Sequence, residues 1–128
     1  MAELTVVADR EYLALARTSA MQVAALLGLS LPQVADLRLA VDEACTSFLV
    51  AAPGRSVELA AVTGATLHLS YDRYPDRLRV TVRGLAPAMW PTQDEFGWEM
   101  LHAVAEQVKT EVVDGIGTLT FTEPLGNG

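Results

Sequence analysis

The sequence predicts an α+β fold, namely a two-layer sandwich in which helices cover one face of a mixed, mostly antiparallel sheet. Two observations predict it. Segments that alternate between apolar and polar residues, as strands do, are joined by short turns, so most of them should pair as antiparallel hairpins. The helical segments stand apart from these hairpins, in the order strand, helix, helix, strand, strand, loop, helix, strand, strand. All of the helices can therefore lie on one face of the sheet.

The first elements are a strand and two helices. Residues 3–8 read ELTVVA, alternate and are rich in β-branched side chains, so we expect a strand there. Asp9 is a suitable N-cap for a helix that runs to Gly28, a residue type that commonly follows a helix C-terminus. The second helix, about 31–50, follows SLPQ (30–33), a capping box in which the serine and glutamine side chains each satisfy a free backbone N–H.

PGRS (53–56) ends the second helix, and extended segments follow it. The candidate strands are VELAAV (57–62), ATLHLSY (65–71) and RLRVTVRG (77–84). The last two flank DRYPD, whose Asp and Pro favour a turn, so we expect an antiparallel hairpin. LAPAMWP (85–91) is a loop punctuated by prolines.

A helix and a hairpin are expected to close the fold. TQDE (92–95) is a second capping box and predicts a helix that runs through about Val108. KTEVVD (109–114) and TLTFTE (118–123) then form the closing hairpin around GIG (115–117).

Composition limits the function classes. The chain has 128 residues, 51% of them hydrophobic, and a formal net charge of −7, which suits one domain (3–123) with a flexible tail (124–128). Such a charge repels nucleic acid and anionic membranes, so neither is an expected partner. Because Cys45 is the only cysteine, no intrachain disulfide can form. We interpret Cys45 as a buried hydrophobic residue rather than a redox switch. Without a signal peptide or membrane-spanning run, a cytoplasmic protein is expected.

The segment DLRLAVDEACTSFLV (36–50) is apolar almost all round, yet it carries two adjacent carboxylates. One stripe should face the sheet and consists of Val34, Leu37, Val41, Ala44, Cys45 and Phe48, and the opposite side consists of Asp36, Ala40, Glu43 and Ser47. Asp42 lies on the flank, where Arg38 can pair with it for about 0.3 kcal/mol. Glu43 beside the Ser47 hydroxyl is either a ligand or metal contact or part of a solvated helix face.

The run ADLRLAVDEACTSFLV, the hairpin after it, the helix ending MLHAVAEQV and the terminal Gly-Thr hairpin resemble the anti-sigma factors of the RsbW type. The resemblance covers about residues 3–123 and implies a histidine-kinase-like ATPase domain with the GHKL (Bergerat) fold, in a family of serine protein kinases. It implies that Glu43 matches the catalytic glutamate, which acts as a base or orients water. Ser47 replaces the asparagine that ligates the magnesium of ATP, and its shorter hydroxyl makes a metal contact doubtful.

The other nucleotide motifs of that family are degenerate here. Its Asp-x-Gly-x-Gly turn, which reads adenine, corresponds to Gly84, Ala86 and Ala88, so the aspartate is lost, at a cost of about 1.5–3 kcal/mol in binding. Of the glycines in its phosphate loop, only Gly97 remains, within TQDEFGWEM.

The final Gly-Thr of the family corresponds to Gly117 and Thr118, although a hairpin turn would need a glycine there in any case. Trp90, expected to be exposed in the loop, is either an anchor for a protein partner or part of a shortened lid packed over the emptied site. His68 and His102 lie far apart in the sequence and are interpreted as structural, so no metal site is predicted.

The resemblance implies an anti-sigma factor that sequesters an alternative sigma factor of the stress or sporulation type and is counteracted by a STAS-domain anti-anti-sigma factor. We expect it to lack ATP-dependent kinase activity, so ATP and magnesium would be cofactors only if the site still functions. Arg17, in LALARTSA, matches an arginine of the family's partner-contacting surface but could equally be solvated. A homodimer is possible, because the first strand offers a free edge.

Two alternatives remain. One is an active serine/threonine protein kinase of the same family that phosphorylates its anti-anti-sigma antagonist. The other is a stand-alone interaction domain of the same fold with another protein partner, since a fold does not by itself define a function.

Overall fold

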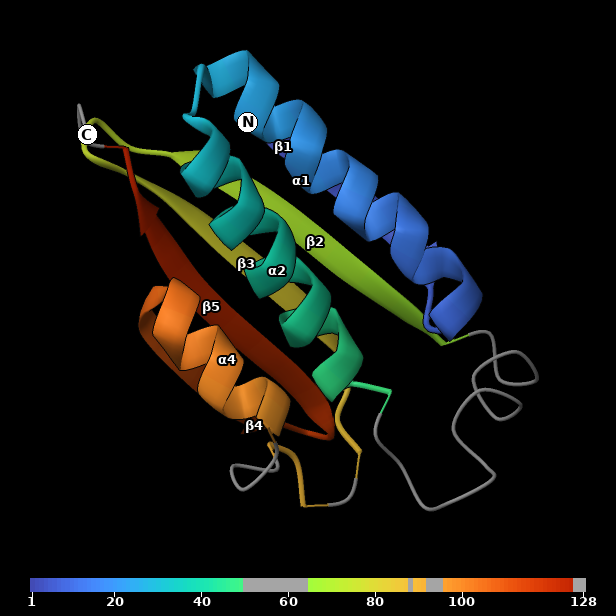
Figure 1. The fold of residues 1–128 in the computed structure, drawn as a ribbon. Coiled ribbons are helices and arrows are strands. Elements are labelled where there is room, and N and C mark those ends of the chain that lie inside the picture. Colours follow the sequence, from blue (N-terminus) through green and yellow to red (C-terminus); the bar gives the residue numbers. More distant parts are fainter. Residues whose placement is uncertain (50–64, 88, 92–95, 126–128) are drawn as a thin grey trace.

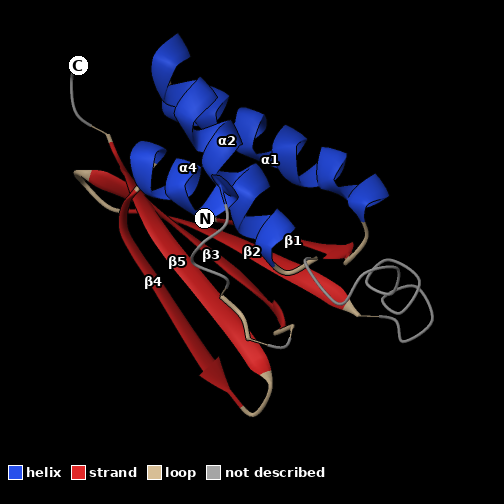
Figure 2. Cartoon of the chain, turned by 60° about the horizontal axis from the view of Figure 1, so that its bottom comes forward, coloured by secondary structure: helices blue, strands red, loops and turns tan. Residues whose placement is uncertain are grey.

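The structure, a computed structural model, describes residues 1–49, 65–87, 89–91 and 96–125. In this part of the chain, a five-stranded sheet carries three α-helices on one face, while no helix covers the other face (Figures 1 and 2). The predicted α+β sandwich is confirmed. No helix in these ranges is both long and apolar enough to cross a membrane.

The elements follow the predicted order. They are β1 (Ala2–Val7), the 3-10 turn η1 (Arg10–Tyr12), α1 (Leu13–Leu27), α2 (Leu31–Ser47), β2 (Thr66–Arg73), β3 (Arg77–Leu85), α4 (Phe96–Val104), β4 (Glu106–Val113) and β5 (Ile116–Pro124). The sheet order is β1-β2-β3-β5-β4, and each neighbouring pair is antiparallel. Both predicted hairpins, β2–β3 and β4–β5, are confirmed.

The ends of the first two helices follow the predicted local chemistry. The Asp9 side chain accepts a hydrogen bond from the Glu11 backbone N–H, although it opens a 3-10 turn that leads into α1. Gly28 ends α1 in the left-handed conformation, at φ 66°. In the capping box, the Ser30 N–H donates to Gln33 Oε1 at 2.8 Å, and the Gln33 N–H donates to Ser30 Oγ at 3.4 Å.

α2 lies between α1 and α4 on the sheet (Figure 1). The stripe predicted to face the sheet is buried or half-buried along its length. Ala40, predicted on the opposite side, is nevertheless completely buried, because α2 has a neighbouring helix on each flank. The helix also ends at Ser47, short of the predicted residue 50.

The third helix and the last turn differ from the prediction. α4 ends at Val104 rather than near Val108, because Glu106 already pairs with Thr122 of β5, and the register shifts between Glu106 and Lys109. The closing turn is Asp114–Gly115, with φ of 52° and 80°, not GIG.

Two predicted features lie outside the described residues. They are the extended segment at 57–62 and the capping box at 92–95.

Candidate functional site

Two glycines lie side by side on the inner face of the sheet. Gly84 of β3 and Gly117 of β5 are register partners, and both are buried. A Cβ at Gly84 would lie 2.7 Å from Leu67 Cδ2. One at Gly117 would lie 2.9 Å from Trp90 Cζ3 and 3.0 Å from Phe48 Cε1. The glycine pair therefore leaves a flat floor against which aromatic rings pack.

Trp90 is buried beside this floor rather than exposed, since only 7% of it is accessible to solvent. Its ring centroid lies 4.7 Å from that of Phe48, with the two planes inclined by 31°. Trp90 Nε1 donates a hydrogen bond to Ser47 Oγ at 3.1 Å. Of the two interpretations of Trp90, packing over the site is the one that agrees with its burial.

Ser47 reaches this site from the last turn of α2. Its hydroxyl donates to the Ala44 carbonyl oxygen at 2.7 Å and accepts from the Trp90 indole. The proton of the hydroxyl and one of its lone pairs are thus already used within the chain, which leaves one lone pair for any other contact.

Glu43 lies one turn earlier on α2, on the flank that faces α4. Its carboxylate contacts Gly97 in the first turn of α4 so closely that a Cβ at that glycine would collide with Glu43 Oε2. Partial burial raises the pKa of Glu43, and the neighbouring Asp42 raises it further. The start of α4 is a favourable place for the negative charge, because of the helix dipole.

Asp42 pairs with Arg17 rather than with Arg38. Arg17 Nη1 lies 2.7 Å from Asp42 Oδ1, and the two side chains are 35% and 27% exposed. The pair joins α1 to α2. The partner of Asp42 is therefore an arginine of α1, not the expected Arg38 of its own helix. The role of Arg17 in binding a partner stays a prediction.

The structure brings together some of the predicted site residues but not all of them. Gly117 and Ser47 both contact Trp90, and Gly84 lies beside Gly117 as its register partner. Strand alternation turns the Thr118 side chain to the opposite face of the sheet from Gly117. Ala86 is half-buried, and its N–H donates to the Gly115 carbonyl at 2.9 Å. Ala88 is outside the described residues.

Sequence reasoning did not predict the contact of Trp90 with Gly117. The available signal was Gly84 at the end of a predicted strand, because strand glycines often mark a close approach of another group, whereas Gly117 was predicted in the GIG turn. Locating that group requires the register of β3 and β5, which the sequence pattern alone does not supply.

The remaining candidates have structural surroundings. Cys45 is fully buried, and burial raises the pKa of its thiol to about 12. On the helix-free face of the sheet, His68 Nε2 lies 2.8 Å from Glu3 Oε1, and His68 Nδ1 lies 2.9 Å from Thr5 Oγ1. His102 lies edge-on to Trp98. The described residues contain no group of three or more His, Cys, Asp and Glu side chains arranged to hold a metal ion.

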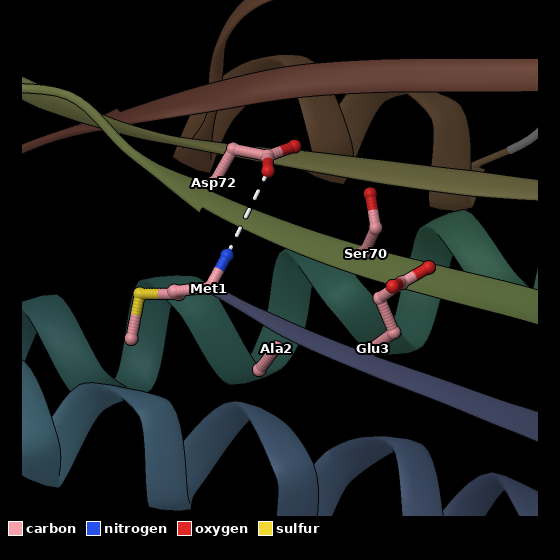
Figure 3. Close-up of a pocket in the computed structure, with 5 residues that line it drawn as sticks. All are labelled: Met1, Ala2, Glu3, Ser70 and Asp72. Carbon is pink, nitrogen blue, oxygen red and sulfur yellow. Dashed lines mark ion pairs between the residues drawn. The ribbon is translucent and has the colours of Figure 1, made fainter.

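A polar hollow lies at the start of β1 and the end of β2 (Figure 3). It is lined by Met1, Ala2, Glu3, Ser70 and Asp72. The Met1 ammonium group lies 3.7 Å from the Asp72 carboxylate and donates to the Tyr71 carbonyl. The register places this hollow at the other end of β2 from Thr66, the residue next to Gly84, so it adds no residue to the site.

No protein-family model matches the sequence. Two curated relatives are similar to it, both named anti-sigma-F factor RsbW, from the CDC 1551/Oshkosh and H37Rv strains of Mycobacterium tuberculosis. Each is 39% identical over 113 residues, which cover 84% of this chain. The chain spans about 60% of the length of these relatives.

A five-stranded antiparallel sheet with three helices packed on one face is consistent with the GHKL-like class of fold. Within that class, the chain is a distant homologue of these two proteins, to which it is similar over 113 residues.

Proposed function

We propose that this protein is an anti-sigma factor, which sequesters an alternative sigma factor of the stress or sporulation type and is released by a STAS-domain anti-anti-sigma factor. The observation that carries the proposal is the 39% identity with anti-sigma-F factor RsbW over most of the chain. The acidic character of the chain, with a net charge of −7, suits a basic protein partner.

We further propose that binding does not depend on ATP or on kinase activity. The hydrogen bond from Trp90 to Ser47 supports this, because it engages the hydroxyl that stands at the position of the family's metal-binding asparagine. The indole also lies against Gly117, another position that matches the nucleotide site. A nucleotide would have to displace a ring that is packed and hydrogen-bonded in place.

Arg17 is the residue we expect to contact the sigma factor. It is 35% exposed even when paired with Asp42, so its remaining guanidinium N–H groups can reach a carboxylate of a partner. Asp42 would then act as a positioning residue that holds the guanidinium at the surface between α1 and α2. A possible homodimer through the free edge of β1 stays a separate prediction.

Retention of purified sigma factors by the tagged protein tests sequestration. We expect at least one alternative sigma factor to be retained without nucleotide, and Arg17→Ala to weaken its retention. Asp42→Ala, which breaks the same ion pair but leaves the arginine in place, should weaken retention less, and Arg38→Ala, at an exposed arginine of α2 outside the pair, is the matched control. Equal retention by wild type and Arg17→Ala would contradict the assigned contact. If no sigma factor is retained, the stand-alone interaction domain becomes the better description.

The alternative of an active kinase has one observation in its favour. Glu43 is half-buried with a raised pKa, as suits a general base. Calorimetry with ATP and magnesium decides between the two, and we expect no binding heat. Binding at micromolar concentrations that is lost in Glu43→Ala, together with phosphate transfer to a STAS-domain protein, would establish the kinase.

A further inference from the structure

Three acidic side chains gather at the end of the sheet where β5 finishes. They are Glu123 near the end of β5, Asp36 of α2 and Glu106 at the start of β4. Glu123 is six positions beyond Gly117, which is about 20 Å along an extended strand. The three acids are therefore separate from the candidate site around Trp90.

Three different elements bring these acids together. Gln33 Nε2 donates to the Pro124 carbonyl at 3.3 Å, so the first turn of α2 is tied to the end of β5 (Figure 1). Asp36 follows Gln33 by three residues and lies on the same side of the helix. Glu106 is the register partner of Thr122, and its carbonyl accepts a hydrogen bond from Thr122 Oγ1 at 3.2 Å. Asp36 and Glu106 are exposed, so they form a rim beside the third acid.

Glu123, the third acid, is buried without a partner of its own. Its side chain faces the helix layer, only 6% of the residue is exposed, and Oε1 accepts no hydrogen bond among the described residues. Burial raises the pKa of Glu123, and the charged groups that raise it further are Asp36 and Glu106, both acids. Its register partner on β3, Leu78, is apolar. Buried carboxyl groups are ordinarily hydrogen-bonded or paired with a cation, so this one lacks its usual complement.

The surroundings favour a positive charge carried by a long side chain. α4 ends at Val104, two residues before Glu106, and the C-terminal end of a helix carries partial negative charge. Within the described ranges, no three His, Cys, Asp or Glu side chains are arranged to hold a metal ion. Lysine or arginine is the better fit, because an apolar stem can pass the rim while the N–H groups reach the carboxylates.

We propose that Asp36, Glu106 and Glu123 form a receptor site for one lysine or arginine side chain of a protein partner. The cation enters between the two exposed acids and pairs with the carboxylate of Glu123, whose proton passes to solvent. The site uses α2, β4 and β5, whereas Arg17 lies on α1. The proposal therefore goes beyond the sigma-factor contact, and any partner with a basic side chain at its surface can supply the group.

Binding of the cation should depend on pH. The pKa of Glu123 is raised to about 8, so the free protein keeps this carboxyl protonated at neutral pH. Because the cation must displace that proton, its affinity should rise roughly 10-fold per pH unit below about 8 and level off above it. The bound cation should in turn lower the pKa of Glu123, since an opposite charge favours the ionised form.

The first test uses the wild-type chain and two peptide probes, acetyl-Gly-Arg-Gly-amide and the same peptide with uncharged citrulline in place of arginine. Carbon NMR of the side-chain carboxyl follows the titration of Glu123 at matched ionic strength. We expect the arginine peptide to lower the midpoint of this titration and the citrulline peptide to leave it unchanged. Equal shifts with both peptides would overturn the proposal. An equal or larger shift with calcium chloride would overturn the assignment to a side chain.

The second test uses variants and calorimetry in buffers of different ionisation enthalpy. Wild type should release close to one proton per bound arginine peptide below pH 8, and Glu123→Gln should release none. Glu106→Gln, which removes one exposed charge of the rim, should weaken binding about 2- to 5-fold and keep the proton release. Glu111→Gln, at an exposed acid of the same strand, is the matched control.

Undiminished peptide binding and proton release in Glu123→Gln would show that Glu123 is not the receptor. The NMR titration is done on wild-type protein, so it decides the question even if a variant does not fold. Neither measurement uses a sigma factor, so a failure of this site and a failure of the proposed function are distinct results.

Discussion

The Glu43 carboxylate of α2 rests directly on Gly97 of α4, leaving no space for even a methyl group between the two helices. The contact explains why the most conspicuous acid of the central helix is neither freely solvated nor fully buried. Substitution at position 97 therefore has a definite expected result.

We expect Gly97→Ala to lower the free energy of unfolding by up to about 1 kcal/mol, because the new methyl group displaces the Glu43 carboxylate, which can turn away at the end of its flexible side chain. In an unobstructed helix, the same change stabilises a protein by about 0.4–1 kcal/mol. Adding Glu43→Ala should therefore recover most of the loss, which urea unfolding of the two single variants and the double variant will measure. A stabilising effect of Gly97→Ala alone would contradict the contact.

The ion pair between Arg17 and Asp42 should contribute about 0.5–1 kcal/mol, since both groups are partly exposed and screened by solvent. A double-mutant cycle with Arg17→Ala and Asp42→Ala should return a coupling energy of that size, reduced in high salt. Arg38→Ala is the control, because Arg38 is exposed and was the expected partner from the sequence. A larger effect at Arg38 than at Arg17 would mean that the pairing is the wrong one.

Glu123 predicts an unusual pH dependence of stability. Its side chain faces inward from β5, the residue is only 6% exposed, and Oε1 has no hydrogen-bond partner among the described residues. Burial, with Asp36 and Glu106 nearby, raises its pKa from 4.5 to about 8. Between these values the unfolded chain releases the proton and the folded chain keeps it, so stability falls as pH rises from about 4.5 to about 8.

We expect Glu123→Gln to remove this fall, so that the variant exceeds wild type at pH 9 by on the order of a few kcal/mol. Urea unfolding at several pH values is the measurement, and Glu99→Gln, at an exposed position on α4, is the control. Parallel stability profiles for wild type and Glu123→Gln would show that Glu123 titrates normally.

Cys45 should report on opening of the core. Its thiol is completely buried and its pKa is raised to about 12, so the reactive thiolate is scarce and inaccessible. We expect a thiol reagent to label the folded protein at least about 1,000-fold more slowly than the unfolded chain, because α2 must leave the sheet first. Rapid labelling without denaturant would place Cys45 nearer the surface.

The local features of the fold could be predicted because they depend on residues close together in the chain. The capping box of Ser30 and Gln33, the left-handed Gly28 and the β2–β3 hairpin all form within a few positions. The end of α4 was predicted too late, because pairing of Glu106 with β5 competes with helix propensity there, and that pairing is not local.

The sequence by itself determined the fold class, the start of α2 and the set of candidate site residues. Only the tertiary structure decided what those residues touch. Ser47 and Trp90 are 43 positions apart, and Arg17 and Asp42 are 25 apart. Helix packing and the register of β3 on β5 bring them together, and these depend on the packing of the whole core, which no short segment encodes.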